Sequence, residues 1–539
     1  TSTTYTYDKN GNRLTMTDPQ AGLTNYAYDA LNRLTSLTSP QGATSFTYDA
    51  LSRRTALNLP NGASASYTYD AASQLTELLN TIGATTISKF AYTYDAVGNR
   101  VTRTTTDGIS NYTYDTLNRL TQAVQPDPID PLQQLTETFT YDPVGNRTAS
   151  HLATGQVHDA ANRLQEDSQF AYTYDANGNL TSKTSKATGE QTVYTYNVEN
   201  QLTRVEKFSI PGGLSPDLTA QYRYDPLGRR ITKEVTQAGT TTTTRYVYDN
   251  EDILLEFDGS NVVQARYTHG PGIDEPLIML RGGQSFFYHA DDLGSIWDLT
   301  DSAGGSVLSH TYDSFGQLIA QTGTLVNPYT YTAREFDPET GLYYYRTRYY
   351  DPATGRFLQE DPIGFLAGLN FYTYGENNPL IIVDPYGLFS WNVIKSSVTF
   401  SGGMSLGLKL KARLSKAQIE ASIIEIGNKS SLNSQEGLTV KAQINAGAIA
   451  KLGKHEIGLK FGRERVTVRQ GEAITNPVTE STSVLFYKQR SGKVGLGTVG
   501  AEATLLIVNL GFELDLVKFF RGVFGGAGDG TPGLASVCK

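Results

Sequence analysis

The dipeptide Tyr-Asp recurs along the first 350 residues, and this repeat limits the fold more than any other feature of the sequence. The early copies follow one another at intervals of 20 to 25 residues. A regular interval of this length indicates supersecondary units that stack on their neighbours, because one such unit cannot bury its apolar face alone. The copies begin at Tyr7, Tyr28, Tyr48, Tyr69, Tyr94, Tyr114, Tyr141, Tyr174, Tyr224, Tyr248, Tyr312 and Tyr350.

Each copy has the pattern of a β-hairpin. Residues 26–35 read Tyr-Ala-Tyr-Asp-Ala-Leu-Asn-Arg-Leu-Thr, in which a Tyr-rich alternation ends at Asp and a Leu/Thr alternation begins after Arg. A period of two residues on both sides of a turn is typical of two antiparallel strands. The sequence therefore predicts an all-β fold, built as one long, continuous antiparallel sheet of hairpins with ladders of Tyr, Asp and Arg along it.

Composition changes abruptly after Leu388. Of the 34 tyrosines, only Tyr487 lies beyond this point. Residues 389–539 hold 19 Lys and Arg against 11 Asp and Glu, which is a formal charge of +8. Since the whole chain carries −9, residues 1–388 carry −17. Two regions that differ this much predict a domain boundary between Leu388 and Phe389.

The stretch that precedes this boundary is long and specific. Residues 343–364 read Tyr-Tyr-Tyr-Arg-Thr-Arg-Tyr-Tyr-Asp-Pro-Ala-Thr-Gly-Arg-Phe-Leu-Gln-Glu-Asp-Pro-Ile-Gly. Residues 370–379 read Asn-Phe-Tyr-Thr-Tyr-Gly-Glu-Asn-Asn-Pro, and residues 384–388 read Asp-Pro-Tyr-Gly-Leu. Together with the repeats, this stretch resembles the RHS-associated core of the YD-repeat, or RHS, family of polymorphic toxins. The resemblance covers residues 1–388.

This resemblance implies a hollow shell and a self-cleaving core. In the family, the repeat sheet spirals into a shell around a variable C-terminal segment, usually a toxin, and the core cuts the chain just after Asp-Pro-x-Gly-Leu. For this chain, it implies a repeat β-shell over residues 1–310 and an autoprotease core that closes the shell over residues 311–388. A variable, basic, β-rich effector domain follows over residues 389–539. The cut is expected between Leu388 and Phe389.

Two aspartates are the candidates for this hydrolysis. Asp361 and Asp384 each precede a proline, and they lie 23 residues apart. Two carboxylates held close together split their pKa values, so that one supplies an acid and the other a base. The resemblance implies that they form the aspartyl-protease-like dyad of the family and that Arg348 is its accompanying arginine, with Arg356 as the alternative. The other interpretation of both Asp-Pro pairs is that they only initiate turns.

The last 151 residues also alternate with a period of two, which predicts half-buried antiparallel strands with one basic face. One short segment, residues 415–427, is compatible with either a strand or a short helix. The region has a single histidine, His455, and the single cysteine of the chain, Cys538, so we expect no metal site and no cofactor. The alternating segments are residues 398–414, 438–446, 457–461 and 508–516.

The basic face suits the phosphates of nucleic acid or an anionic membrane. No stretch of the chain reaches the roughly 18 apolar residues that a membrane-spanning helix needs. Alternating strands without a catalytic cluster suit a segment that inserts as a β-barrel pore, and they equally suit a soluble sheet domain. On these grounds, membrane action ranks ahead of nuclease activity for the effector.

The sequence supports functions of different classes. The first is a toxin that is secreted or delivered to a target cell, with its own C-terminal domain as cargo and with an immunity protein and a secretion apparatus as partners. The second is a non-enzymatic YD-repeat scaffold for adhesion at the bacterial surface. The third is a terminal domain that binds a partner without harming it. Because Thr1 falls within a repeat, we expect this chain to be part of a longer protein.

Overall fold

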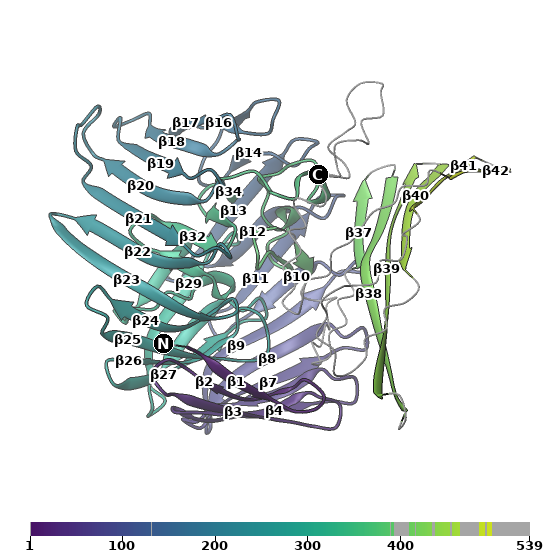
Figure 1. Cartoon of the computed structure of the whole chain (residues 1–539). Helices are drawn as coiled ribbons and strands as arrows, with labels where there is room; N and C mark the ends of the chain where they lie inside the picture. Colours follow the sequence, from purple (N-terminus) through teal and green to yellow (C-terminus); the bar gives the residue numbers. More distant parts are fainter. Residues whose placement is uncertain are drawn as a thin grey trace. The chain divides into compact units, whose positions relative to one another are not determined.

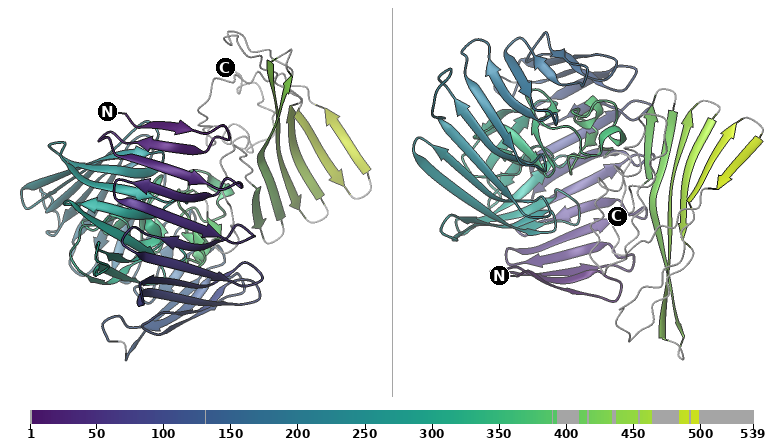
Figure 2. Two further views of the ribbon diagram at one scale, coloured as in Figure 1. Left: turned by 90° about the horizontal axis from the view of Figure 1, so that it is seen from below. Right: turned by 45° about the horizontal axis from the view of Figure 1, so that its top comes forward.

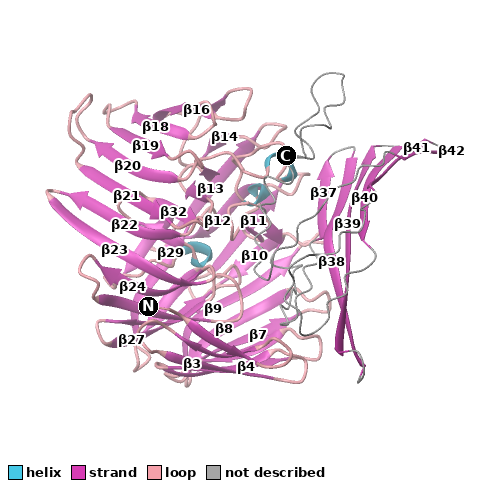
Figure 3. Cartoon of the chain, viewed as in Figure 1, coloured by secondary structure: helices cyan, strands magenta, loops and turns pink. Residues whose placement is uncertain are grey.

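The structure is a computed structural model, and its described residues lie almost entirely in antiparallel strands and the turns between them (Figure 3). The described part of the chain has three helices, each a single 3₁₀ turn: η1 (Tyr331–Ala333), η2 (Gly364–Leu366) and η3 (Gly375–Asn377). Among these described residues, no helix has the length and apolar character needed to cross a membrane. The structure describes residues 2–130, 132–388 and 390–392, and the backbone of six strands between residues 409 and 498.

The chain divides by its internal contacts into two compact units, Thr1–Gly402 and Gly403–Lys539. The first unit extends past Leu388 because β36 (Trp391–Asn392) pairs with β35 (Ile382–Val383). The domain limits expected from the sequence stay predictions.

The first unit contains two large antiparallel sheets in which the strands follow one another in chain order (Figure 1). The first sheet has 14 strands: β1 (Thr4–Tyr7), β2 (Arg13–Thr17), β3 (Leu23–Tyr28), β4 (Leu34–Ser39), β5 (Gly42–Tyr48), β6 (Arg54–Asn58), β7 (Ala63–Tyr69), β8 (Leu75–Ile82), β9 (Thr85–Tyr94), β10 (Arg100–Thr104), β11 (Ile109–Tyr114), β12 (Leu120–Pro126), β13 (Gln134–Tyr141) and β14 (Arg147–Ser150). This simple order confirms the predicted succession of hairpins.

The second sheet has 16 strands: β15 (Val157–His158), β16 (Leu164–Glu166), β17 (Phe170–Tyr174), β18 (Leu180–Ser185), β19 (Gln191–Tyr196), β20 (Leu202–Phe208), β21 (Leu218–Tyr224), β22 (Arg230–Gln237), β23 (Thr240–Asp249), β24 (Asp252–Asp258), β25 (Val263–His269), β26 (Pro276–Arg281), β27 (Gln284–Ala290), β28 (Ile296–Thr300), β29 (Ser306–Tyr312) and β30 (Leu318–Thr322). A four-stranded sheet follows: β31 (Glu335–Asp337), β32 (Leu342–Tyr345), β33 (Arg348–Asp351) and β34 (Arg356–Phe357). The repeat sheet thus continues to Thr322 before the chain turns to the smaller sheet.

In most Tyr-Asp copies the aspartate builds the turn of the hairpin, whereas the carboxylate of Asp249 binds Tyr5 and Arg13. In one copy, Asp29 Oδ1 accepts hydrogen bonds from the backbone N–H groups of Leu31, at 2.9 Å, and Arg33, at 3.0 Å. Asn32 between them has a φ of +58°, a left-handed conformation that asparagine and glycine adopt more readily than other residues. In the Gly-Asn copies a glycine takes this place, as at Gly98 with a φ of +94°. The copies with asparagine and the copies with glycine at this position therefore form the same turn.

In the copies that have an arginine four residues after the aspartate, this arginine joins its hairpin to the next one. Arg33 Nε donates to Asp29 Oδ2 at 2.6 Å, and its Nη1 donates to the carbonyl oxygen of Asp49 at 3.1 Å. The guanidinium lies 4.9 Å from the ring centre of Tyr48, whose hydroxyl donates to the carbonyl oxygen of Leu34 at 2.8 Å. The predicted ladders of Tyr, Asp and Arg are therefore present. Equivalent stacking on a tyrosine recurs at Arg53, Arg119, Arg163 and Arg229.

The sheet differs from the expectation in one respect, because it is interrupted between β14 and β15. The intervening residues, His-Leu-Ala-Thr-Gly-Gln at positions 151–156, lack the alternation of Tyr and Thr, and Gly155 has a φ of +62°. A backbone hydrogen bond of 3.1 Å from Gln156 N–H to the carbonyl oxygen of Thr148 still crosses the interruption. The predicted continuous ribbon is thus two ribbons in series.

The beginning of the first sheet contacts the second sheet, so the ribbon curls back on itself within the first unit (Figure 2). Arg13 of β2 forms an ion pair with Asp249 at the end of β23. Met16 shares an apolar cluster with Leu254 and Leu255 of β24. Three more ion pairs join the two sheets: Asp18–Arg266, Arg54–Glu275 and Arg100–Asp292.

The hairpin β32–β33 lies between the inner faces of the two large sheets (Figure 1). Tyr343 and Tyr345 belong to an apolar cluster that contains Phe90 of the first sheet. Tyr344 belongs to another cluster that contains Tyr222 of the second sheet. Successive side chains of a strand point to opposite faces, and a run of tyrosines can therefore bury both faces of one hairpin.

The first unit is hollow. A cavity of about 1520 Å³ is lined by residues of the first sheet between Gly11 and Gly98 and by residues of the second sheet between Asp249 and Ile296. Val383, Pro385 and Tyr386 also line it. The segment that leads to Leu388 therefore borders the interior space.

The second unit contains a six-stranded antiparallel sheet in chain order, which agrees with a β-rich C-terminal part. Residues 417–427 belong to its second strand, so the alternative of a short helix is wrong for them. The predicted alternation at residues 508–516 lies outside the described residues. The strands are β37 (Lys409–Leu414), β38 (Ala417–Asn433), β39 (Gly437–Leu452), β40 (His455–Arg463), β41 (Val484–Arg490) and β42 (Lys493–Thr498).

Candidate functional site

The structure brings Arg348, Asp361 and Asp384 together inside the first unit. Arg348 Nη2 lies 2.8 Å from Asp361 Oδ2 and 3.2 Å from Asp384 Oδ2. Because both carboxylates contact the same nitrogen, these two oxygens lie within about 6 Å of each other, a range at which like charges raise each other's pKa. All three residues are buried, with exposed fractions of 2%, 6% and 2%.

Each aspartate also forms the turn that its Asp-Pro sequence predicts. Asp361 follows β34, and its Oδ1 accepts a hydrogen bond of 3.0 Å from the N–H of Ile363. Asp384 follows β35, and its Oδ1 accepts a hydrogen bond of 2.9 Å from the N–H of Leu388. In each aspartate the second oxygen is the one that faces Arg348. The two interpretations of these residues are therefore compatible.

The electrostatics of the pair favour proton exchange near neutral pH. The pKa of Asp361 is raised to about 7, chiefly by burial and to a smaller extent by the charge of Asp384. The Arg348 guanidinium and the hydrogen bond from Ile363 act against this rise. A carboxyl group with such a pKa exists in both protonated and ionised forms at neutral pH, as an acid–base catalyst requires.

Arg348 is fixed by partners on every side. Its Nε donates to the carbonyl oxygen of Gly387 at 2.6 Å, and its Nη1 donates to the carbonyl oxygen of Phe371 at 2.8 Å. Its guanidinium carbon lies 3.6 Å from the centre of the Phe357 ring. The arginine therefore connects the carboxylate pair with the chain just before Leu388.

Arg356, the alternative arginine, lies elsewhere. Its Nη1 donates to Asn146 Oδ1 at 3.2 Å, and its Nη2 donates to the carbonyl oxygen of Asn162. Both partners belong to turns of the shell. Of the two arginines considered, Arg348 is therefore the one that meets the aspartates.

Gly387 is required by the geometry of this segment. It has a φ of +64°, and a Cβ atom there would lie 2.7 Å from the carbonyl oxygen of Tyr345 and 3.0 Å from Thr347 Oγ1. Only a residue without a side chain fits this close approach. Leu388 follows directly and is half-buried, whereas Phe389 lies outside the described residues.

Comparison with known families decides the classification of the chain. The profile of the Teneurin YD-shell family matches residues 109–380, and the profile of the RHS repeat matches residues 28–64. The chain belongs to the RHS/YD-repeat family. Its first unit is thus a YD-repeat shell, as the resemblance implies.

Relatives of this RHS chain have different named activities. The tRNA3(Ser)-specific nuclease WapA of Bacillus spizizenii is 32% identical over 316 residues, which are 57% of this chain and 11% of that protein. The double-stranded DNA deaminase toxin A of Burkholderia cenocepacia is 28% identical over 325 residues, which are 55% of this chain and 22% of that protein. The chain thus spans between a tenth and a quarter of the length of these relatives.

A solved structure has the same fold as the RHS shell. The Tc holotoxin pore of Photorhabdus luminescens, with a substituted TccC3, matches with a TM-score of 0.61 and 24% identity over 74% of this chain and 22% of that chain. This likeness concerns the fold alone.

Two residues of the site were not predicted from the RHS sequence. Thr347 Oγ1 lies 2.6 Å from the carbonyl oxygen of Tyr386 and 2.8 Å from that of Gly387. Arg346 Nη1 donates to the carbonyl oxygen of Pro385. Their one sequence signal is that Arg-Thr-Arg interrupts a run of tyrosines at positions 343–350, where a buried hairpin would otherwise be aromatic throughout.

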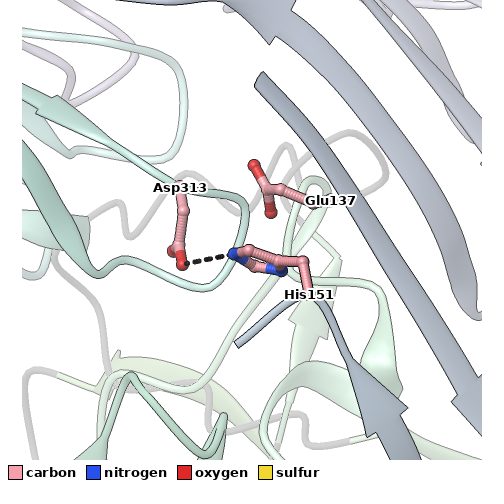
Figure 4. A group of neighbouring side chains, drawn as sticks. All are labelled: Glu137, His151 and Asp313. Carbon is pink, nitrogen blue, oxygen red and sulfur yellow. Dashed lines mark ion pairs between the residues drawn. The ribbon is translucent and has the colours of Figure 1, made fainter. Parts of the chain in front are cut away.

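A cluster of Glu137, His151 and Asp313 was also not predicted (Figure 4). Their potential ligand atoms lie within 4.8 Å of one another, and His151 Nε2 lies 4.0 Å from Asp313 Oδ2. Burial raises the pKa of Glu137 to about 8 and that of Asp313 to about 6, and it lowers the pKa of His151 to about 4. However, both oxygens of Glu137 already accept the N–H of Ser314, at 3.2 and 3.0 Å, and Gln125 donates to one of them. The arrangement fits a hydrogen-bonded polar cluster better than a metal site.

Proposed function

We propose that this chain is the shell and the self-cleaving core of an RHS-type toxin, and that Asp361 and Asp384 hydrolyse the peptide bond between Leu388 and Phe389. The cut would separate residues 389–539 as the effector. The observation that carries the proposal is the position of Asp384. It shares Arg348 with Asp361 through one oxygen and accepts the N–H of Leu388 through the other.

The proposed reaction is a hydrolysis by a carboxylate pair that holds one proton. The ionised carboxylate takes a proton from a water molecule, whose oxygen attacks the carbonyl carbon of Leu388. The protonated carboxyl group gives its proton to the carbonyl oxygen, so a neutral tetrahedral intermediate forms. When the carbon–nitrogen bond breaks, the nitrogen of Phe389 takes up a proton, and the products are a carboxyl group on Leu388 and an amine on Phe389. The two aspartates exchange their protonation states during the cycle, as a coupled pair does.

Arg348 supports this reaction in two ways. It keeps one carboxylate ionised by its charge, and it fixes the carbonyl oxygen of Gly387, next to the bond to be cut. Positioning of this kind lowers the activation free energy of the hydrolysis, because the reacting groups have already lost their translational and rotational freedom before the transition state.

Intact mass under denaturing conditions tests the proposal. We expect the wild type to give two fragments that meet between Leu388 and Phe389, and Asp361→Asn and Asp384→Asn each to give one chain of 58.8 kDa. Asp351→Asn is the matched control, since Asp351 is another buried Asp-Pro residue of the same core whose partner is Lys183. This control should be cut like the wild type. A single species from the wild type would contradict the autoprotease and favour the surface scaffold.

We further propose that the effector acts on nucleic acid inside a target cell, to which the toxin is delivered. The names of the relatives support nucleic-acid chemistry, which replaces membrane action as the leading alternative. The charge of +8 on residues 389–539 also suits phosphates. Incubation of the released fragment with tRNA, with double-stranded DNA and with dye-loaded anionic vesicles separates the alternatives. Dye release without any change in either nucleic acid would contradict this part of the proposal.

A further inference from the structure

Three consecutive residues hold three consecutive carbonyl groups ahead of the proposed cut. Arg346 binds the carbonyl oxygen of Pro385, Thr347 binds that of Tyr386, and Arg348 binds that of Gly387. The three donors form the tip of the hairpin β32–β33, where Tyr345 and Arg348 are a cross-strand pair. The tip therefore fixes the register of the segment that leads to Leu388.

The first of these donors is itself fixed by the shell. Arg346 Nη2 lies 2.7 Å from Asp274 Oδ1, and its Nη1 lies 3.2 Å from Asp274 Oδ2. Asp274 lies in the loop between β25 and β26 of the second large sheet, 72 positions before Arg346. A carboxylate that receives both arms of a guanidinium determines the plane and the direction of that group.

Asp274 and its two arginine partners are largely shielded from water, and the side chain of Arg334 is 3% exposed. The side chain of Asp274 is 9% exposed and that of Arg346 is 11% exposed. Asp274 also binds Arg334, which donates to the carbonyl oxygen of Tyr344 in β32. One carboxylate of the shell thus binds two arginines, one at the tip of the hairpin and one that bonds to β32.

We propose that Asp274 is a positioning residue for the self-cleavage. It aims Arg346 at the carbonyl oxygen of Pro385, and the bond after Leu388 is presented to the carboxylate pair only when the loop between β25 and β26 has folded. This inference rests on the proposed function, and it adds that the cut depends on the shell. A chain whose second sheet is incomplete would remain uncut even though Arg348, Asp361 and Asp384 are all present.

The reason is geometric. Without the carboxylate, a buried guanidinium loses its charged partner and turns toward other acceptors, such as the backbone carbonyls around it. The segment from Pro385 to Leu388 then keeps the hydrogen bonds from Thr347 and Arg348 and loses the one from Arg346. Displacement of a reacting bond by about 1 Å slows a reaction on the order of 100-fold.

A time course of cleavage in the full chain tests this inference. The wild type, Asp274→Asn, Arg346→Lys and the double variant are made by cell-free synthesis, and intact and cut chains are followed by mass. We expect Asp274→Asn and Arg346→Lys each to slow the cut about 10- to 100-fold. The double variant should be no slower than the slower single variant, because both changes break one connection. The fragments that do form should have unchanged masses.

Glu275→Gln is the matched control. Glu275 is the next residue of the same loop and pairs with Arg54 of the first sheet. This substitution takes one charge from the loop and should leave the rate within about twofold of the wild type, because among the described residues no contact given for Glu275 reaches the segment before Leu388. Thermal unfolding of each variant in an Asp361→Asn background, where no cut occurs, reports any change in folding.

The outcomes are distinct. If the wild type stays intact, both the proposed self-cleavage and this inference are contradicted. A wild type that is cut, with Asp274→Asn cut at the same rate, overturns the inference alone. Equal slowing by Asp274→Asn and Glu275→Gln, with equal loss of thermal stability, also overturns it, since a weakened loop would then explain both. Rate changes that are additive in the double variant contradict the connection between Asp274 and Arg346.

Discussion

The repeats and the core use the same two residue types, aspartate and arginine, under different conditions. In the repeat that contains Asp29, one arginine serves one aspartate, and the two side chains are 16% and 24% exposed. In the core, Arg348 serves both Asp361 and Asp384, and all three side chains are at most 3% exposed. The structural pair has one carboxylate for its arginine and is partly exposed to water. The proposed site has two carboxylates for its arginine and is buried.

The pKa values follow this difference. Burial acts to raise the pKa of Asp29, but the backbone and side-chain hydrogen bonds from Arg33 outweigh it and lower the value. In the core, burial dominates and raises the pKa of Asp361 to about 7. Near water, the hydrogen bonds of the arginine keep the aspartate ionised, whereas burial beside a second carboxylate favours the protonated form of Asp361. Four predictions test this comparison.

The largest expected effect comes from exchanging arginine for lysine in both regions. Arg348→Lys keeps the charge but cannot reach the carbonyl oxygens of Gly387 and Phe371 and both carboxylates together, so cleavage should slow about 100- to 1000-fold. Arg53→Lys changes the equivalent pair of a repeat and should leave the cleavage rate unchanged, with a cost of about 1 kcal/mol or less in unfolding free energy. Intact mass over time and thermal unfolding measure the two effects. Equal cleavage rates in Arg348→Lys and Arg53→Lys would contradict the proposal that the core arginine has a role in cleavage that the repeat arginine lacks.

Gly387→Ala should have the next largest effect. The added Cβ would lie 2.7 Å from the carbonyl oxygen of Tyr345, so the segment must move and cleavage should slow about 100-fold. Gly62→Ala is the control, because Gly62 also has a positive φ, of +86°, but no atom lies within 4 Å of the added Cβ. Both variants bear the backbone strain of about 1–2 kcal/mol, and only the first should change the time course of cleavage. A slow Gly62→Ala would point to strain alone.

The pH dependence of cleavage tests the raised pKa of Asp361. If protonated Asp361 supplies the proton, the rate should be steady below about pH 7 and should fall about tenfold for each pH unit above it. The folded pKa is above the ordinary value, so the acid form is lost only as the pH rises through this range. Rates from rapid pH shifts of freshly made chain give the profile. Asp29→Asn should leave the midpoint where it is, and a profile that is flat from pH 6 to 9 would falsify the assignment.

The smallest effect is expected at Thr347. Thr347→Val removes the hydroxyl that binds the carbonyl oxygens of Tyr386 and Gly387, and the loss of about 1 kcal/mol should slow cleavage about fivefold. Thr347→Ser keeps the hydroxyl and should cut at nearly the wild-type rate. Thr6→Val is the comparison in the repeats, where Thr6 shares a hydrogen bond with Thr15, and it should leave the rate unchanged. If serine behaves like valine, the methyl group rather than the hydroxyl of Thr347 would be responsible.

The sequence was informative wherever neighbours along the chain determine the structure. The turn at Asp29 depends on contacts with residues two and four positions later, and such local contacts give a regular repeat that can be read directly. The meeting of Asp361 and Asp384 followed from resemblance, not from spacing. The interruption between β14 and β15 could not be foreseen as a break, because a few residues without alternation also occur in ordinary loops of the sheet.

Contacts over long sequence distances were beyond sequence reasoning. Asp274 follows a glycine-rich turn and resembles any loop aspartate, and nothing near it in the sequence indicates Arg346, 72 positions away. The choice between Arg348 and Arg356 was equally open, since both arginines stand among aromatic residues. The three-dimensional curl of the shell places one beside the carboxylates and the other on turns at Asn146 and Asn162.

The pairing of β35 with β36 has a consequence for the cut itself. Ile382 pairs with Asn392, and Val383 pairs with Trp391, so Leu388 stands in the loop of a hairpin whose strands lie on both sides of the proposed cleavage point. If the chain is cut in this loop as proposed, the pairing of β35 with β36 still connects the two new ends. Breaking the covalent bond and parting the two pieces are then separate events with separate rates. A mass measurement under denaturing conditions would then find two fragments, while a mass measurement of the folded protein would still find one particle.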